Sequence, residues 1–526
     1  MTRPGVRCLP LALTAVALLF VASLFIYTIG NDFPYRFHPD ERSKVTQIQT
    51  GRRNFLHPQL LLECTALIVG NQTGMTRQQV AETGRTVSAV AAAIAVSALA
   101  WTGYLEFGLL GLLCAGCSVG LCAQLVPYAH YMKEDAVFIM GLSLVMLAGR
   151  WFTLAERGRA RWVAAVALGA AAGVAMSAKY VGALAVLPVI VWTLTVPRAD
   201  RCPPGWGCLL VALAAAIVTV AAINHRAFQS PETFFEAIRF EFGHSLRGQK
   251  EGGLQRPNAY FLDAVWSDTD RWVLGSGVVY ALVALFRPAC RSRWTVGGVA
   301  LTLVFLGTLS ISSIPFHRYA LPVIVLLHLW AALGWMELSR VAELRLPARS
   351  AWMARWALPS LALFIIVARC GAQTLDAVDQ FQDDSRVRLR YWLQAHAKAR
   401  DGVAGEFYSG IHEKARLSWY LPPVTQRRSE LFDAAFEKPA SNGVCYAVLC
   451  EPAYDRYLNP HARPVKGKEV ECERRRALLQ RIRREGRLVW CSAEDGRRNL
   501  HAFTNPLIEV YELPGSWQPV QPQAAP

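Results

Sequence analysis

Two adjacent carboxylates, Asp40 and Glu41, follow directly on a long apolar run and stand among His38, Arg42 and Lys44. Successive helical residues point about 100° apart, so only one of two neighbouring carboxylates can face a given substrate. We therefore predict a catalytic pair in which Asp40 is the base and Glu41 is its supporting or metal-binding neighbour. The alternative is a plain polar loop leaving a membrane, and the rest of the chain has to decide between the two.

A second polar cluster, Lys133-Glu134-Asp135, separates two apolar runs. Charged groups at the end of a membrane helix are costly unless water or a function satisfies them. The cluster is either a solvated turn or a second acidic site for a metal or the acceptor. We add His57 and His244 to this second site because their loops are expected on the same side of the membrane.

Four cationic or imidazole side chains are candidates for holding a phosphate: Lys179, Arg226, His317 and Arg318. Lys179 lies in a tight hairpin between apolar runs, where it either reaches the lipid headgroups or binds a lipid-linked phosphate. Arg318 stands just before another apolar run, and a guanidinium group matches the geometry of phosphate oxygens. Together they predict a phosphate site at the membrane surface.

The composition decides the class of protein. Of 526 residues, 53% are hydrophobic and only 18% are charged, and this is too apolar for a soluble protein of this size. The net charge of +16 comes largely from Lys and Arg in short loops, where such residues orient a membrane protein. We therefore exclude nucleic acid as a partner and expect anionic lipids or phosphate-bearing substrates.

Apolar runs of about 15–22 residues predict a polytopic α-helical membrane protein. The eleven candidate helices are Leu9–Ile29, Val87–Leu105, Phe107–Val126, Ala136–Leu154, Trp162–Met176, Val181–Val196, Cys208–Ile223, Trp272–Phe286, Val296–Ile311, Ala320–Trp335 and Trp356–Ala368.

Arginine-rich loops at 150–161, 287–293 and 340–355 indicate the cytoplasmic side of a plasma (inner) membrane. The N-terminus is then cytoplasmic, and the candidate site residues and the C-terminus lie outside. In the first outer loop, Leu56–Gly70 is partly apolar and is expected to form short helices along the interface.

The composition changes near residue 376. Short β-like runs alternate with helical stretches over about 140 residues, which is typical of a small α/β domain. We predict a transmembrane catalytic domain at 1–375, an extracytoplasmic α/β domain at 376–517 and a disordered tail at 518–526.

Carboxylates beside several cations at one membrane face suit the transfer of a group from a lipid phosphate. The acceptor hydroxyl loses a proton, which needs a positioned carboxylate, and the departing phosphate gains charge, which needs Lys or Arg. One alternative is a transporter or flippase, which would place polar residues and broken helices at the bilayer midplane. Another is a glycan ligase or polymerase that uses a pyrophosphate-linked donor.

The chain resembles the GT-C superfamily of polyprenyl-phosphate-sugar-dependent glycosyltransferases, in particular the protein O-mannosyltransferases and the lipid A aminoarabinose transferase. The resemblance covers almost the full length. It rests on His38-Pro-Asp40-Glu41, His57-Pro58, Gly84-Arg85-x-x-Ser88, Lys133-Glu134-Asp135-Ala136, Gly173…Lys179-Tyr180, His317-Arg318-Tyr319-x-x-Pro322 and Asp384-x-Arg386…Tyr391-Trp392-Leu393.

The resemblance implies an inverting membrane glycosyltransferase that moves one hexosyl or pentosyl unit from a polyprenyl phosphate to a lipid, glycan or protein acceptor at the outer face. Asp40 would activate the acceptor, and Lys179 and Arg318 would face the donor phosphate. Glu134 and Asp135 match an acidic site that in some members, with the first-loop acidic residue, holds a divalent metal such as Mg or Mn and in others works without one.

Overall fold

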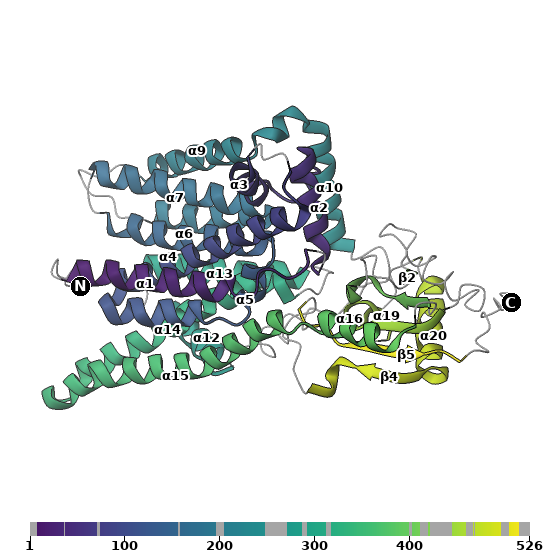
Figure 1. The fold of residues 1–526 in the computed structure, drawn as a ribbon. Helices are drawn as coiled ribbons and strands as arrows, with labels where there is room; N and C mark the ends of the chain where they lie inside the picture. Colours follow the sequence, from purple (N-terminus) through teal and green to yellow (C-terminus); the bar gives the residue numbers. More distant parts are fainter. Residues whose placement is uncertain are drawn as a thin grey trace.

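The computed structural model describes residues 8–35, 37–70, 74–155, 158–195, 205–247, 271–286, 292–311, 317–398, 402–410, 419–420, 444–458, 467, 469–495 and 504–514. Within this part, apolar helices form a bundle and a five-stranded sheet forms a separate domain at one end of it (Figure 1). The N-terminus lies at the opposite end of the bundle (Figure 1).

In the described part of the chain, eight helices are long and apolar enough to cross a membrane. This confirms the predicted fold class of a multi-pass α-helical membrane protein. The bundle consists of α1 (Leu9–Thr28), α4 (Arg77–Gly120), α6 (Glu134–Leu154), α7 (Gly158–Ala178), α8 (Val186–Leu194), α9 (Gly205–Ile223), α12 (Arg271–Phe286), α13 (Arg293–Ile311), α14 (Leu321–Arg345) and α15 (Ala348–Gln382).

Helix α4 is two helices that double back on each other. Its backbone leaves the helical region at Phe107 and at Gly108, where φ is +68°, a value that glycine adopts at little cost. A Cβ atom on Gly103 would lie 2.3 Å from the carbonyl oxygen of Gly111, so the two halves approach backbone to backbone. The turn falls where the sequence predicts a break between two spans; the total of eleven spans stays a prediction.

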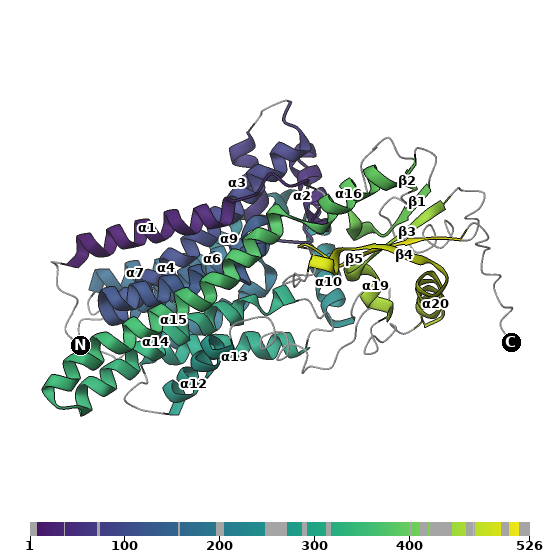
Figure 2. The same ribbon diagram turned by 60° about the horizontal axis from the view of Figure 1, so that its bottom comes forward.

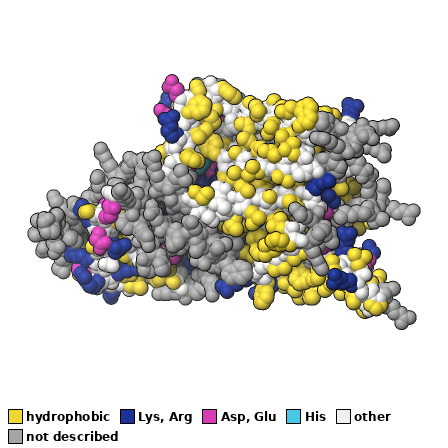
Figure 3. Space-filling view, turned by 180° about the vertical axis from the view of Figure 1, so that it is seen from behind, with side chains coloured by type: hydrophobic (Ala, Val, Ile, Leu, Met, Phe, Trp, Pro, Cys, Tyr) yellow, Lys and Arg dark blue, Asp and Glu magenta, His cyan; other side chains and the backbone are white. Residues whose placement is uncertain are grey.

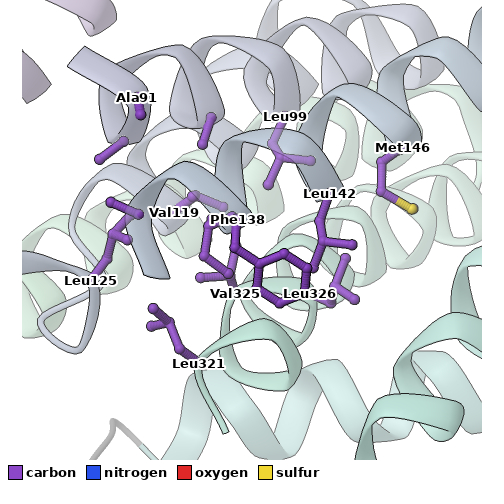
Figure 4. Close-up of a cluster of buried hydrophobic side chains, with 14 of the residues drawn as sticks. Ala91, Leu99, Val119, Leu125, Phe138, Leu142, Met146, Leu321, Val325 and Leu326 are labelled. Atoms are coloured by element: carbon purple, nitrogen blue, oxygen red, sulfur yellow. The ribbon is translucent and has the colours of Figure 1, made fainter. Parts of the chain in front are cut away.

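Aliphatic and aromatic side chains from helices far apart in the sequence form the core of the bundle (Figure 4). Phe138 and Leu142 of α6 lie near Val325 and Leu326 of α14 in this cluster (Figure 4). On the face shown in Figure 3, the surface of the bundle is also broadly hydrophobic, with charged side chains gathered near its ends. A surface of this kind suits lipid as the surrounding solvent.

Short elements cover the end of the bundle that faces the sheet domain (Figures 1 and 2). Leu67 and Ile68 of α3 are 84% and 60% exposed, as expected for a helix that lies along the interface. These elements are α2 (Pro39–Thr50), α3 (Leu60–Val69), α5 (Leu125–His130), η2 (Tyr180–Ala185), η3 (His225–Gln229), α10 (Pro231–Arg247) and η4 (His317–Tyr319).

The sheet domain is α/β, with strand order β2-β1-β3-β5-β4. Strand β1 pairs in parallel with β2 and β3, whereas β5 pairs antiparallel with β3 and β4. The strands are β1 (Gly402–Gly405), β2 (Trp419–Tyr420), β3 (Val444–Cys450), β4 (Arg487–Cys491) and β5 (Ile508–Glu512), and the helices are α16 (Ser385–His396), α19 (Glu451–Leu458) and α20 (Glu469–Glu485).

Alternate residues of β3 pack on opposite faces of the sheet. Ala447 and Leu449 join the cluster of α19 and α20, whereas Tyr446 and Val448 join the cluster of α16. This alternation follows from the two-residue period of a strand. Helix α15 runs to Gln382, beyond the predicted boundary at 375, and the tail at 518–526 lies outside the described residues.

Candidate active site

Helix α2 begins at the predicted acidic pair. His38 is its N-cap, and the Nδ1 atom of His38 accepts a hydrogen bond of 3.2 Å from the backbone N–H of Asp40. Pro39 occupies the first helical position, where its missing N–H costs nothing. Burial lowers the pKa of the His38 imidazole well below its ordinary value, so the ring stays neutral and can accept this bond. The cap places Asp40 in the first turn of α2.

The neighbouring carboxylate, Glu41, points into the protein. Arg85 of α4 donates two hydrogen bonds to the Glu41 carboxylate, from Nε to Oε1 at 2.9 Å and from Nη2 to Oε2 at 2.6 Å. Both side chains are fully buried. The backbone N–H of Met132 donates a third bond of 2.9 Å to Oε1. Of the predicted catalytic pair, Glu41 is therefore a supporting residue and not one that can reach a substrate.

The Gly84-Arg85-x-x-Ser88 pattern has a structural explanation. A Cβ atom on Gly84 would lie 2.4 Å from Cγ of Met132, so glycine at this position leaves room for the Met132 side chain against α4. The backbone N–H of Lys133 donates to Oγ of Ser88 at 3.2 Å. This pattern therefore holds both Glu41 and the backbone of Lys133 in place.

Asp40 points in a different direction and remains accessible, with 32% of its side chain exposed. Its Oδ2 atom pairs with Nζ of Lys133 and lies 3.6 Å from Nη1 of Arg318. Burial raises the pKa of the Asp40 carboxyl, but the charges of Lys133, Lys44 and Arg318 overcome this effect and hold it well below its ordinary value. Asp40 is thus an ionised carboxylate at neutral pH.

The first turn of α6 supplies two more carboxylates, and each has its own lysine. Glu134 pairs with Lys44 of α2 at 3.0 Å, and both side chains are 3% exposed. Oδ1 of Asp135 accepts a hydrogen bond of 2.6 Å from Nζ of Lys179. Among the described residues, the buried Oδ2 atom of Asp135 has no hydrogen-bond partner.

Lys179 and Arg318 share an aromatic neighbour. Nζ of Lys179 lies 4.9 Å from the ring centroid of Tyr319, and the guanidinium carbon of Arg318 lies 5.4 Å from it. The two cations therefore flank one ring, although they come from segments well over a hundred residues apart in the sequence. This arrangement brings together Lys179 and Arg318, two of the four side chains for which the sequence predicts phosphate binding.

Ion pairing leaves this centre with an excess of positive charge. Among the described residues it holds the three carboxylates of Asp40, Glu134 and Asp135 and the four cations of Lys44, Lys133, Lys179 and Arg318. The centre therefore suits an anionic ligand, and a phosphodiester carries the one negative charge that would balance it. We call these seven residues the charged centre.

His57 belongs to the same neighbourhood. Burial lowers the pKa of its imidazole to about 4, and the charges of Glu134, Lys133, Lys44 and Asp40 also act on it. The ring is therefore neutral near pH 7 and can donate one hydrogen bond and accept another.

Arg226 is fastened to the interfacial helices. Its Nε atom lies 2.9 Å from Oε1 of Glu63 in α3, which also pairs with Arg53 at 3.1 Å. Its Nη1 atom donates to the carbonyl of Gly51 at 3.1 Å. These contacts hold η3 against α2 and α3, so we leave Arg226 out of the phosphate site. His244 and His317 belong to α10 and η4, but their side chains lie outside the described residues.

Glu241 of α10 is a neighbour of the charged centre that the predicted site does not include. Burial raises the pKa of its carboxyl to about 7, against the charges of Arg318 and Lys133. Phe234, seven residues earlier, packs against Phe55 and Tyr180 with ring centroids 5.8 and 6.4 Å apart. Residues seven apart lie on the same face of a helix. Glu241 therefore lies on the face of α10 that Phe234 packs against the protein, and this spacing is the sequence signal that could have identified it.

The carboxylates do not fit a divalent metal. Asp40, Glu134 and Asp135 each have a lysine ammonium at ion-pair distance, and within the described residues no group of three His, Cys, Asp or Glu side chains has the arrangement of a metal site. Mg²⁺ and Mn²⁺ need carboxylate oxygens as ligands, and here the lysines occupy that side of each carboxylate. We therefore derive no step through a metal.

Comparison with solved structures identifies the fold. ArnT from Cupriavidus metallidurans bound to undecaprenyl phosphate aligns with a TM-score of 0.54 and 17% identity over 96% of this chain and 99% of that chain. The apo state of the same protein aligns with a TM-score of 0.53 and 17% identity over 97% and 100% of the two chains.

The oligosaccharyltransferase of Archaeoglobus fulgidus in its apo form aligns with a TM-score of 0.50 and 10% identity over 85% of this chain and 70% of that chain. No protein-family model and no curated protein matches the sequence. The chain therefore shares the fold of these two solved proteins, ArnT and the archaeal oligosaccharyltransferase.

Proposed function

We propose that this chain, which has the GT-C fold, is a membrane glycosyltransferase that moves one sugar from a polyprenyl phosphate to an acceptor hydroxyl at the outer end of the bundle. The observation that carries the proposal is the charged centre. It combines an exposed, ionised carboxylate with an excess of positive charge at the end of an apolar bundle.

The donor phosphate would lie between Lys179 and Arg318. Both cations flank Tyr319, directly before α14, so a polyprenyl tail can stay in lipid while its phosphate meets the protein. A donor phosphodiester has one negative charge and the leaving polyprenyl phosphate has up to two. Cations aimed at the phosphate therefore stabilise the transition state more than the ground state.

Asp40 would act as the base. It accepts the proton of the acceptor hydroxyl as the acceptor oxygen bonds to the anomeric carbon. The bond from that carbon to the phosphate oxygen breaks, and its electron pair leaves with polyprenyl phosphate. A single displacement of this kind inverts the configuration at the anomeric carbon.

Donor binding would also strengthen Asp40 as a base. In the structure the Asp40 carboxylate pairs with Lys133 and Arg318. These positive charges lower the pKa of Asp40 and therefore make it a weaker base. An incoming phosphate competes for the same cations, so the pKa of Asp40 rises when the donor is present. The base is then most reactive when a sugar is available.

The ArnT structure bound to undecaprenyl phosphate supports the choice of a lipid-linked donor. The cluster of ionisable groups at one end of the bundle, instead of at its middle, favours a transferase over a transporter or flippase. A ligase or polymerase with a pyrophosphate-linked donor is the second candidate, and the donor panel below separates it.

The test uses the purified full chain in lipid nanodiscs with a panel of radiolabelled undecaprenyl-phosphate sugars and, in parallel, undecaprenyl-pyrophosphate sugars. We expect release of undecaprenyl phosphate from at least one member of the first set, in the presence of a membrane extract as acceptor. Mass spectrometry of surface lipids and glycans, with and without the chain, then identifies the product.

Asp40→Asn is expected to lower the rate by about 100- to 10,000-fold, as for loss of a general base. Asp32→Asn is the matched control because Asp32 is exposed and precedes the charged centre. Full activity of the Asp40→Asn variant would remove Asp40 from the role of base, and turnover of the pyrophosphate set alone would favour the second candidate.

A further inference from the structure

The sheet domain, which we call the outer domain because the proposed topology places it outside the membrane, contacts the start of α2. Helix α16 is capped by Asp384, whose Oδ1 atom accepts a hydrogen bond of 2.9 Å from the backbone N–H of Arg386. The side chain of Arg386 returns to the same carboxylate, with Nε donating to Oδ1 at 2.8 Å and Nη2 to Oδ2 at 2.6 Å. This pairing holds the guanidinium group in one orientation.

The remaining guanidinium nitrogen of Arg386 contacts the membrane domain. Its Nη1 atom donates a hydrogen bond of 2.6 Å to the carbonyl of Phe37, and its guanidinium carbon lies 4.0 Å from the ring centroid of Phe37. The two residues are 349 positions apart in the sequence. Arg386 and Asp384 are 4% and 2% exposed, so water competes little for these contacts.

The surrounding chain leaves this contact little freedom. A Cβ atom on Gly410, where φ is +72°, would lie 3.1 Å from Cδ of Arg386 and 3.3 Å from the ring of Phe37. On the other side of the carboxylate, the backbone N–H of Asn505 donates to Oδ2 of Asp384 at 2.9 Å. Backbone at Gly410 and at Asn505 thus encloses the Arg386–Asp384 pair from two sides.

A second contact runs beside the first. The hydroxyl of Tyr131 lies 3.1 Å from Oγ1 of Thr504 in the outer domain, and the Tyr131 ring lies 4.7 Å from the His38 ring, centroid to centroid. His38 is the N-cap of α2 and binds the backbone of Asp40. Both contacts thus end on Phe37 and His38, two of the three residues that precede Asp40.

We propose that Arg386 is a positioning residue for Asp40. By holding Phe37 it fixes the start of α2, and through α2 it fixes the distance from the Asp40 carboxylate to Lys133 and to the acceptor. The outer domain then sets the reactivity of a base in the membrane domain, and a shift of this domain alters catalysis without any contact to substrate. The catalytic part of this inference rests on the proposed function.

The test compares Arg386→Ala and Arg386→Lys with Arg481→Ala, a change in the same domain at a residue that pairs with Glu485 of its own helix α20. We expect Arg386→Ala to lower kcat by about ten- to a hundredfold, because a displacement of about 1 Å can cost this much. The KM for the donor should change less than about twofold, since Lys179 and Arg318 are untouched. Arg386→Lys keeps the positive charge but loses the planar guanidinium group, so its kcat should lie between those of the parent and of Arg386→Ala.

The pH profile separates positioning from simple loss of folded protein. Asp40 is faced by Lys133, His38, Lys44 and Arg318, and the three cations keep it ionised. If α2 moves, the carboxylate loses contact with Lys133 and Arg318, which lie outside α2, and the acid limb of kcat/KM shifts to higher pH. A fall in the amount of folded protein lowers the whole profile without moving that limb.

Hydrogen exchange tests whether Arg386 fixes the start of α2, and it needs no assay of activity. Amides of residues 37–44 should exchange faster in Arg386→Ala than in the parent, and amides of α14 should not change. Tyr131→Phe removes only one hydroxyl and serves if Arg386→Ala does not fold; it should give the same changes on a smaller scale. Unchanged exchange at residues 37–44, or a lower kcat with an unmoved acid limb, would overturn the proposal. A parent without transferase activity but with faster exchange in the variant would overturn only the proposed function.

Discussion

The ion pairs around Asp40 and those along helix α20 are built from the same residue types in opposite surroundings. Glu41 and Arg85 are completely buried, and Lys44 and Glu134 are 3% exposed. In the outer domain, Arg476 and Glu473 are 32% and 69% exposed, and Arg484 is 74% exposed. Burial decides what the loss of one partner does. Around Asp40 it leaves a buried charge without compensation, whereas along α20 it leaves a charge that water solvates.

The basic stretch of α20 belongs to the exposed kind of ion pair. Its arginines pair with glutamates of the same helix or of β5, as in Arg481–Glu485, Arg483–Glu509 and Arg476–Glu473. Most of its positive charge is therefore balanced locally. The charged centre in contrast keeps an excess cation where a substrate can reach it.

The largest expected effect is on folding. Glu41→Gln leaves the buried Arg85 guanidinium without its anion and should lower the free energy of unfolding by about 3–5 kcal/mol. Thermal unfolding of the purified protein in detergent measures it. Glu473→Gln, in an exposed pair, is the matched control, and equal losses in both variants would contradict the comparison.

A substitution at the phosphate site should act on catalysis instead. Lys179→Met removes one of the two cations beside Tyr319 and should lower kcat/KM by about a hundredfold, the usual scale for a group that stabilises developing charge. Donor turnover in nanodiscs measures it, with Lys398→Met as a control outside the membrane domain. A normal rate would show that Lys179 serves only to pair with Asp135.

Lys133→Met sharpens the comparison through pH. The carboxyl of Asp40 has a pKa held well below its ordinary value, and Lys133 is the strongest of the charges that lower it. Without Lys133 the pKa rises, so the ionised base is lost at a higher pH. We expect the acid limb of the kcat/KM profile to move up by about one unit or more. An unmoved limb would mean that Asp40 is not the group that titrates.

Glu241 should contribute a smaller, pH-dependent effect. Burial raises the pKa of its carboxyl to about 7, so it gains a negative charge near the phosphate site as the pH rises through neutrality. The KM for the donor should therefore increase by about threefold, equivalent to about 0.7 kcal/mol, between pH 6 and pH 8. Glu241→Gln should abolish this rise, and a rise that persists would exclude Glu241 as its source.

The smallest effect is expected at the surface. Arg483→Ala removes a pair with Glu509 in which Arg483 is 34% exposed, and the free energy of unfolding should fall by at most about 0.5 kcal/mol. Chemical denaturation of the full chain measures it. A loss as large as that of Glu41→Gln would break the distinction between the two regions.

The charged centre could be predicted in part because its members stand at the ends of apolar runs. Asp40, Lys133, Lys179 and Arg318 all follow or precede a predicted span, and alternating spans bring such ends to one side of a membrane. The roles of their neighbours could not be predicted in the same way. Glu41 and Asp40 look alike in the sequence, and only the position of Arg85 makes one of them structural.

By itself, the sequence determined the membrane class, the order of the helices, the bundle end to which the charged residues belong and the α/β character of the outer segment. These properties depend on local hydrophobicity and on periods of two and 3.6 residues, which a single strand or helix already carries. Only the tertiary structure decided which carboxylate is fully buried, which stays partly exposed, and that Arg386 meets Phe37 across 349 positions. Such pairings depend on close packing between segments, as at Gly84 and Gly410, and no local pattern encodes which distant surface will meet them.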